Sequence, residues 1–143
     1  IRNPQLMRIV QDMNRILTEG TLTANELSII VLTVARHWSA KYPWAVQVRN
    51  ALKVGLGQNV IDAINGRAAL PTEDARENLV HKLANELLAD QGLSDASYAE
   101  AEAAFTTDEL ITVIARIGAF SMTCCTANGF DITPPDEVPS RLQ

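Results

Sequence analysis

Cysteine, aromatic residues and basic charge are all scarce in this sequence. Its only cysteines, Cys124 and Cys125, are adjacent, so the chain has no disulfide framework. Lysine and arginine number 12 against 17 aspartates and glutamates, which gives a net charge of -5. That balance disfavours general binding to nucleic acid or to an anionic membrane surface.

Segments that direct or anchor a chain are also missing. No apolar run approaches the roughly 20 residues that span a bilayer. No signal peptide is visible, and the start at Ile1 leaves open whether an N-terminal piece is absent. We therefore expect a cytoplasmic protein that has no membrane partner.

The remaining composition is that of an ordinary globular protein. With 143 residues, 47% hydrophobic and 20% charged, the chain is large enough to bury a core without disulfides or metals. We expect a single domain over residues 1–143, with a tail at 130–143 that is too proline-rich for a helix.

Every periodic segment of the chain favours a helix. Leu6, Ile9, Val10 and Met13 recur at three- and four-residue steps, and β-branched residues elsewhere lie inside similar patterns rather than alternating ones. The sequence predicts an all-α fold of about seven helices. They run from Pro4 to Gly20, from a Thr23 cap to about Lys41, from Pro43 to Gly55, from Asn59 to Ile64, from a Thr72 cap to Gly92, and onward from caps at Ser94 and Thr106.

Two of these helices begin in the same way. Thr23 with Glu26, and Thr106 with Glu109, each form a capping box before an apolar run, at an offset of 83 residues. Either the chain contains a duplicated helical unit, or two common caps precede two apolar helices.

The strongest candidate site lies at the end of the second helix and in the third. This stretch gathers amphipathic and polar side chains after a nearly all-apolar helix: His37, Trp38, Lys41, Tyr42, Trp44, Gln47 and Arg49. We expect a ligand to bind here.

The same stretch carries a family resemblance. ARHWSAKYPWAVQVRNALKVGL, VIDAINGR, SDASYAEAEAAF, DELITVIARIGAFSMTCCTANGF and the P-x-x-VP tail occur in the order and spacing of the carboxymuconolactone decarboxylase family, which is related to alkylhydroperoxidase D. The resemblance implies an alkylhydroperoxidase D-like helical fold that assembles into trimers or hexamers. It also implies that there is no metal and no organic cofactor.

The sequence departs from both branches of this family. The peroxidase branch has Cys-x-x-Cys and a histidine where this chain has Trp38, Lys41 and Ala45, so a thiolate pair is missing there. The decarboxylase branch resembles Tyr-Glu-Trp-x-x-His, whereas this chain has Pro43 and Gln47 in place of the ionisable pair. Gln47 can hydrogen-bond a ligand but cannot take a proton near pH 7.

Other groups could move a proton instead. Glu26 and His37 are 11 residues apart on one helix, so they share a face with Thr33, about 16 Å apart along the axis. Tyr42 is the third catalytic candidate. The alternatives are that Glu26 serves only its capping box and that His37 only bonds the last carbonyls of its helix.

The binding candidates are Trp38, Trp44, Gln47 and Arg49. Arg49, with Arg36, Lys41 and Lys53, could hold a carboxylate, or these residues form a solvated face. We expect Trp44 on the pocket wall and Trp38 in packing.

Two further groups are weaker candidates. Cys124, with Ser121 and Asn128, repeats the peroxidatic spacing and is either a nucleophile or a core residue. We expect His81 on a solvent face.

Two functions remain open. One is a cofactor-independent enzyme acting on a small carboxylated or cyclic organic acid by proton transfer, decarboxylation or isomerisation. The other is a non-catalytic member that binds a ligand or serves as an assembly subunit.

Overall fold

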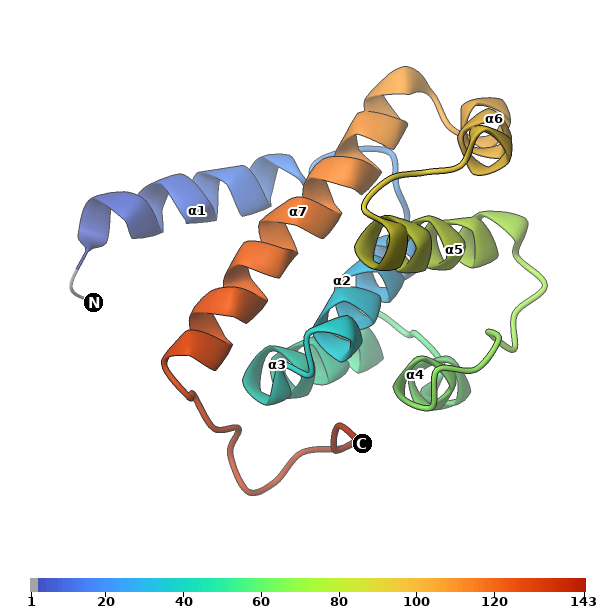
Figure 1. The fold of residues 1–143 in the computed structure, drawn as a ribbon. Helices are drawn as coiled ribbons and strands as arrows, with labels where there is room; N and C mark the ends of the chain where they lie inside the picture. The colour runs from blue at the N-terminus through green and yellow to red at the C-terminus, as the bar shows by residue number, and fades with distance from the viewer. Residues whose placement is uncertain (1–2) are drawn as a thin grey trace.

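The computed structural model describes residues 3–143, which form seven α-helices and no β-strand (Figure 1). The predicted all-α class and the number of helices are confirmed. The helices are α1 (Pro4–Ile16), α2 (Ala24–His37), α3 (Lys41–Lys53), α4 (Gln58–Asn65), α5 (Ala75–Asp90), α6 (Asp95–Ala104) and α7 (Thr107–Gly129).

Local capping explains where most helices begin. The Asn3 side chain accepts the Leu6 N–H at 3.0 Å and opens α1, and the Ser94 hydroxyl accepts the Ser97 N–H at the start of α6. Both predicted capping boxes are present, at α2 and at α7. The duplication that they suggested stays a prediction.

Several helix boundaries differ from those expected, among them the end of α1, the end of α2 and the start of α5. Helix α1 ends at Ile16, before Gly20, and α2 ends at His37 because Ser39 adopts the left-handed conformation, with φ 49°. Helix α5 is capped by Asp74, whose carboxylate accepts two backbone N–H groups. Thr72 instead donates its hydroxyl proton to the Glu77 carboxylate at 2.7 Å.

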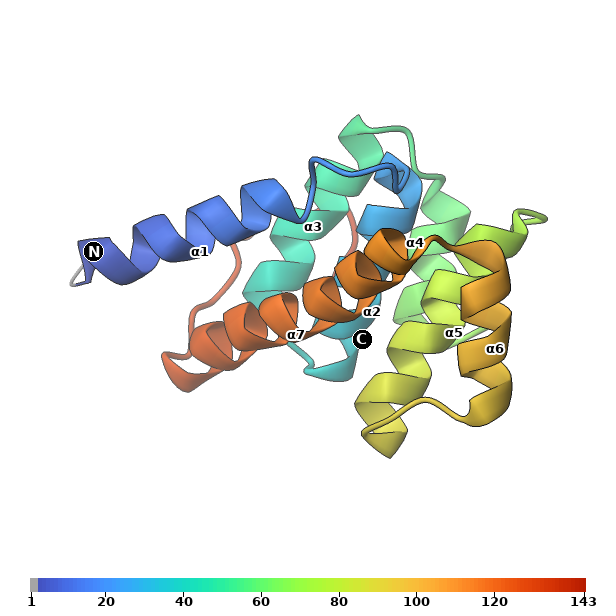
Figure 2. The same ribbon diagram turned by 90° about the horizontal axis from the view of Figure 1, so that it is seen from above.

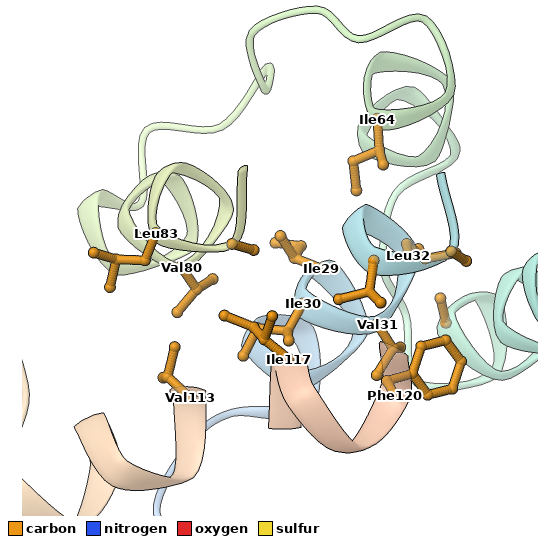
Figure 3. Packing of buried hydrophobic residues seen from close by; sticks show 14 of the residues in the cluster. Ile29, Ile30, Val31, Leu32, Ile64, Val80, Leu83, Val113, Ile117 and Phe120 are labelled. Atoms are coloured by element: carbon orange, nitrogen blue, oxygen red, sulfur yellow. The ribbon is translucent and has the colours of Figure 1, made fainter. Parts of the chain in front are cut away.

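Helix α2 is the centre of the fold. Its middle is apolar on all sides, and Ile29, Ile30 and Leu32 are fully buried. Helices α3, α4, α5 and α7 pack around it, as Figures 1 and 2 show. Figure 3 shows side chains of α5 and α7 meeting α2 in one core, with Ile64 of α4 at its edge.

Helix α1 lies outside this core. It projects beyond the bundle in Figures 1 and 2 and contributes no buried residue. Leu6, Ile9 and Ile16 are each more than half exposed. The apolar side of α1 therefore leaves much of its surface uncovered, and part of it forms one wall of a groove.

Helix α7 is the one helix among residues 3–143 that is long and apolar enough to cross a membrane, by length and composition only. The expectation that no segment reaches this length was therefore wrong. It is weak evidence for a membrane, because the core helix of a soluble protein passes the same test. Val113, Ile117 and Phe120 of α7 are buried in the core. The predicted cytoplasmic location and oligomer stay predictions.

Candidate functional site

The structure divides the predicted site residues among different places. Tyr42 and Gln47 line a groove between α1, α3 and α7. His37 lines a cavity between α2, α4 and α5, and Trp44 lies beneath the C-terminal tail. Glu26 lies at the opposite end of α2 from His37.

The groove has a volume of about 350 Å³, within the range of small-molecule sites. Its walls carry no charged side chain. They are Leu6, Met7 and Val10 of α1, Tyr42, Pro43, Val46 and Gln47 of α3, Phe120, Met122, Thr123, Thr126 and Ala127 of α7, and Ile132 of the tail. The sequence anticipated the α3 wall but not the walls from α1, α7 and the tail.

Few polar groups in the groove are free to meet a ligand. Thr123 and Thr126 donate their hydroxyl protons to carbonyls one turn back on α7. The side chains of Tyr42 and Gln47 make no hydrogen bond with residues 3–143. These two groups, a phenol and an amide, can therefore orient oxygen atoms of a bound molecule.

The C-terminal tail packs against Trp44 and the start of α3. The Trp44 Nε1–H donates to the Ser140 carbonyl at 3.0 Å, and Arg49 donates to the Glu137 carbonyl. Asn65 donates its amide proton to the Arg141 carbonyl at 2.8 Å. Arg49 thus holds the tail in this structure and does not line the groove.

The two tryptophans differ in burial. Trp44 is 1% exposed and belongs to the core, whereas Trp38 is 38% exposed and meets the His37 ring edge-on, with centroids 5.8 Å apart. The expectation that Trp38 serves packing was wrong, because it follows the end of α2 and turns outward. Neither tryptophan lines the groove.

Glu26 is held by an ion-pair network. The Arg76 Nε donates to Glu26 at 2.6 Å, and another Arg76 nitrogen donates to Glu109 at 3.1 Å. The second Glu26 oxygen accepts the Thr23 N–H of the capping box. Glu26 is 2% exposed, so its carboxylate serves structure here, the simpler of the two roles weighed for it.

Glu109 completes this network. Hydrogen bonds from Arg76, from the Thr21 hydroxyl and from the Thr106 N–H lower the pKa of Glu109 to about 2. The same pairing raises the pKa of the Arg76 guanidinium. One arginine on α5 therefore ties together the starts of α2 and α7.

His37 lines what we call the basic cavity, with a volume of about 160 Å³. Its walls are Thr33, Arg36 and His37 of α2, Ile64 and Arg67 at the end of α4, and His81 and Asn85 of α5. Thr33 and His37 share this wall as predicted, whereas Glu26 does not reach it. The expected solvent position of His81 was wrong, because α5 packs against α2 and half-buries the ring.

Both imidazoles in the basic cavity are shifted in the same direction. Burial, followed by repulsion from Arg67, lowers the pKa of His37, and burial lowers the pKa of His81. Both rings are therefore neutral near pH 7, and each offers one donor and one acceptor.

The cysteines are not poised for redox chemistry. Cys124 is fully buried, and burial raises the pKa of its thiol to about 12, so almost no thiolate forms near pH 7. Cys125 is exposed on α7, and both cysteines are free. Residues 3–143 hold no cluster of three histidine, cysteine, aspartate or glutamate side chains that could bind a metal ion.

Two arginines that the structure places at important positions, Arg67 and Arg76, were not predicted from the sequence. Arg76 lies in the first turn of α5, where the helix dipole disfavours a cation, and that placement was a signal of an acidic partner. Arg67 follows Gly66 with φ 55°, in a conformation that favours glycine, and only the fold brings it to His37.

Comparison with known proteins supports the fold. No family model matches the sequence, and no curated protein resembles it closely enough to count as a relative. Among solved structures, a protein of unknown function from Agrobacterium tumefaciens, suggested to be the antioxidant defence protein AhpD, superposes with a TM-score of 0.85. It is 18% identical and covers 94% of this chain and 93% of its own.

A second solved structure agrees. An uncharacterized peroxidase-related protein from Ralstonia eutropha, with an alkylhydroperoxidase AhpD core, gives a TM-score of 0.79 at 20% identity, over 94% of this chain and 73% of its own. Identity this low shows the fold alone. The chain has the AhpD-like fold that the sequence predicted.

Proposed function

We propose that this protein binds a small, largely apolar cyclic molecule in the groove between α1, α3 and α7. The observation that carries this proposal is the pairing of uncharged walls with two free polar groups, Tyr42 and Gln47. A cavity of about 350 Å³ suits one small organic molecule. Tyr42 and Gln47 would hydrogen-bond its oxygen atoms.

Because no charged side chain lines the groove, the part of a ligand that enters it should be uncharged. A carboxylate placed among these walls would lose its hydration and gain no cationic partner, which is costly. The part of the ligand that enters is therefore neutral, a ring with a carbonyl or hydroxyl. This supports ligand binding over decarboxylation, since no histidine, aspartate, glutamate or lysine side chain lines the groove.

The names of the similar solved structures suggest peroxidase activity as an alternative function for this fold. Peroxide reduction by cysteine needs a thiolate nucleophile, and Trp38 and Lys41 stand where the family pattern has its cysteines. Cys124 is protonated in the core. We therefore propose no peroxidase activity.

Methionine methyl signals test binding in the groove. Of the three methionines, Met7 and Met122 line the groove and Met13 does not. We expect cyclohexanone and toluene, titrated separately into methyl-labelled protein, to shift the Met7 and Met122 signals and leave the Met13 signal unchanged. Shifts of all three, or of none, would contradict the proposal.

Two matched variants test the polar contacts. Tyr42→Phe and Gln47→Leu keep the shape of the groove and remove one polar group each. Each should weaken cyclohexanone binding about fivefold, the value of one neutral hydrogen bond, and leave toluene binding unchanged. Equal loss for both probes would mean that the substitutions changed the groove itself.

A second candidate function is cofactor-free proton transfer on a small cyclic organic acid. One observation favours it: Pro43 and Gln47, which replace the Glu and His of the decarboxylase pattern, lie one helical turn apart and both line the groove. The altered positions thus face the volume where a ligand would bind.

Restoring the pair tests this candidate. Pro43→Glu with Gln47→His places an imidazole beside a carboxylate that can orient it, and general acid–base catalysis is worth about 10²–10⁴-fold. We expect the double variant to release CO2 from carboxymuconolactone and Gln47→His alone to release less. A folded double variant without activity would overturn the enzyme candidate and leave the binding proposal standing.

A further inference from the structure

The basic cavity lies on a different side of α2 from the groove. Figures 1 and 2 place α4 and α5 on one side of α2 and α1 on the other. We infer that the basic cavity binds a compact oxyanion, a carboxylate or a phosphate group. This inference does not depend on the function proposed for the groove.

Uncompensated positive charge is the first argument. Arg36 and Arg67 both line the cavity, and no acidic side chain is among its walls. None of the ion pairs among residues 3–143 includes either arginine. Burial, followed by repulsion from Arg67, lowers the pKa of Arg36, so the two cations lie close enough to repel each other. A bound anion would relieve that repulsion.

Free hydrogen-bond donors are the second argument. Arg36 uses only its Nε, which donates to the Asn65 carbonyl at 2.7 Å. Its two terminal nitrogens remain available to donate to a ligand. The Arg67 side chain donates to no atom of residues 3–143. His37 and His81 each add an imidazole donor at the wall. Guanidinium groups match carboxylate and phosphate oxygens in pairs.

The backbone at Arg67 is the third argument. Its φ of 55° is left-handed, at the position after a helix where glycine costs least. An arginine persists there at some cost to stability, and its side chain reaches the cavity wall. A strained backbone conformation that persists beside a cavity often marks a ligand-binding site.

Size limits the class of anion. The cavity, at about 160 Å³, is much larger than one water needs and smaller than sites for drug-sized ligands. It therefore fits a single compact anionic group, free or at the end of a larger molecule. Inorganic phosphate and malonate represent the two chemistries.

The histidines give a local readout. His37 and His81 are the only histidines in the sequence, and both line the cavity. We expect sodium phosphate or sodium malonate, titrated into the full chain at constant ionic strength and pH 7.5, to shift both imidazole signals to saturation. Tighter phosphate binding would point to a phosphorylated ligand, and tighter malonate binding to a carboxylate. Met7 and Met122 signals should not move, which separates this test from that of the groove.

Arg67→Gly separates binding from stability. Glycine relieves the left-handed backbone, so the thermal midpoint should stay the same or rise. Loss of the guanidinium should weaken anion binding at least about tenfold. Arg8→Gln removes the same charge from an exposed position on α1, away from the cavity, and should change neither quantity. Linear shifts without saturation, or equal affinity in Arg67→Gly, would overturn the inference.

Discussion

Arg76→Leu is expected to lower the free energy of unfolding by about 3–5 kcal/mol. The Arg76 guanidinium meets Glu26 at 2.6 Å, Glu109 at 3.1 Å and the Ala104 carbonyl at 2.9 Å. Its removal leaves the Glu26 carboxylate, which is 2% exposed, without a cationic partner. A buried unpaired charge costs far more than a lost surface pair. Urea unfolding at pH 7 measures the change.

The exposed pair Lys82–Glu100 provides the matched control. Its ions are also 2.6 Å apart, but about half of each side chain is in water. Lys82→Leu on the same helix should therefore cost less than about 1 kcal/mol. If Arg76→Leu costs no more than Lys82→Leu, the network does not hold the starts of α2 and α7 together.

The same network predicts how stability responds to acid. The folded pKa of Glu109 is about 2, below the unfolded value near 4.3. A depressed pKa contributes stability above the unfolded value, and that contribution is lost as the pH falls toward 2. The wild type should therefore lose stability between about pH 4.5 and pH 2. Arg76→Leu should lose less over this range, because the largest cause of the shift is gone.

Local features of this fold were predictable and distant ones were not. The caps at Asn3, Thr23, Ser94 and Thr106 depend on residues three positions apart, and all four are present. The end of α2 was misjudged because its apolar pattern continues past His37 while Ser39 turns the backbone. The spacing of apolar residues predicts that a helix is present more reliably than it predicts the residue at which the helix ends.

The candidate sites depend on contacts that no local pattern holds. Tyr42 and Gln47 were found because they share one helix, but the groove needs α1, whose amphipathic pattern gives no sign that it stands outside the core. His37 was found, whereas Arg67, which follows α4, and His81, which lies on α5, reach the same cavity only when these helices pack against α2. Segments of different helices meet only through tertiary packing, which one sequence does not specify.

Trp44→Ala is expected to lower the free energy of unfolding by about 3–5 kcal/mol, the usual cost of removing a buried tryptophan. The side chain is 1% exposed and is among the largest in the core. Trp38→Ala is the matched control, and because Trp38 is 38% exposed it should cost about 1 kcal/mol or less. Urea unfolding compares the two, and the opposite order would mean that Trp38 is the core anchor that the sequence suggested.

Trp44→Phe isolates the contact with the tail. Phenylalanine keeps most of the ring in the core but cannot donate to the Ser140 carbonyl, a loss of about 1 kcal/mol. The tail should then open more often, because only the hydrogen bonds from Asn65 and Arg49 still hold its backbone near this position. Trypsin cleavage after Arg141, followed by intact mass, should be several times faster than in the wild type. Unchanged cleavage in a folded Trp44→Phe variant would mean that Trp44 packs beneath the tail without holding it in place.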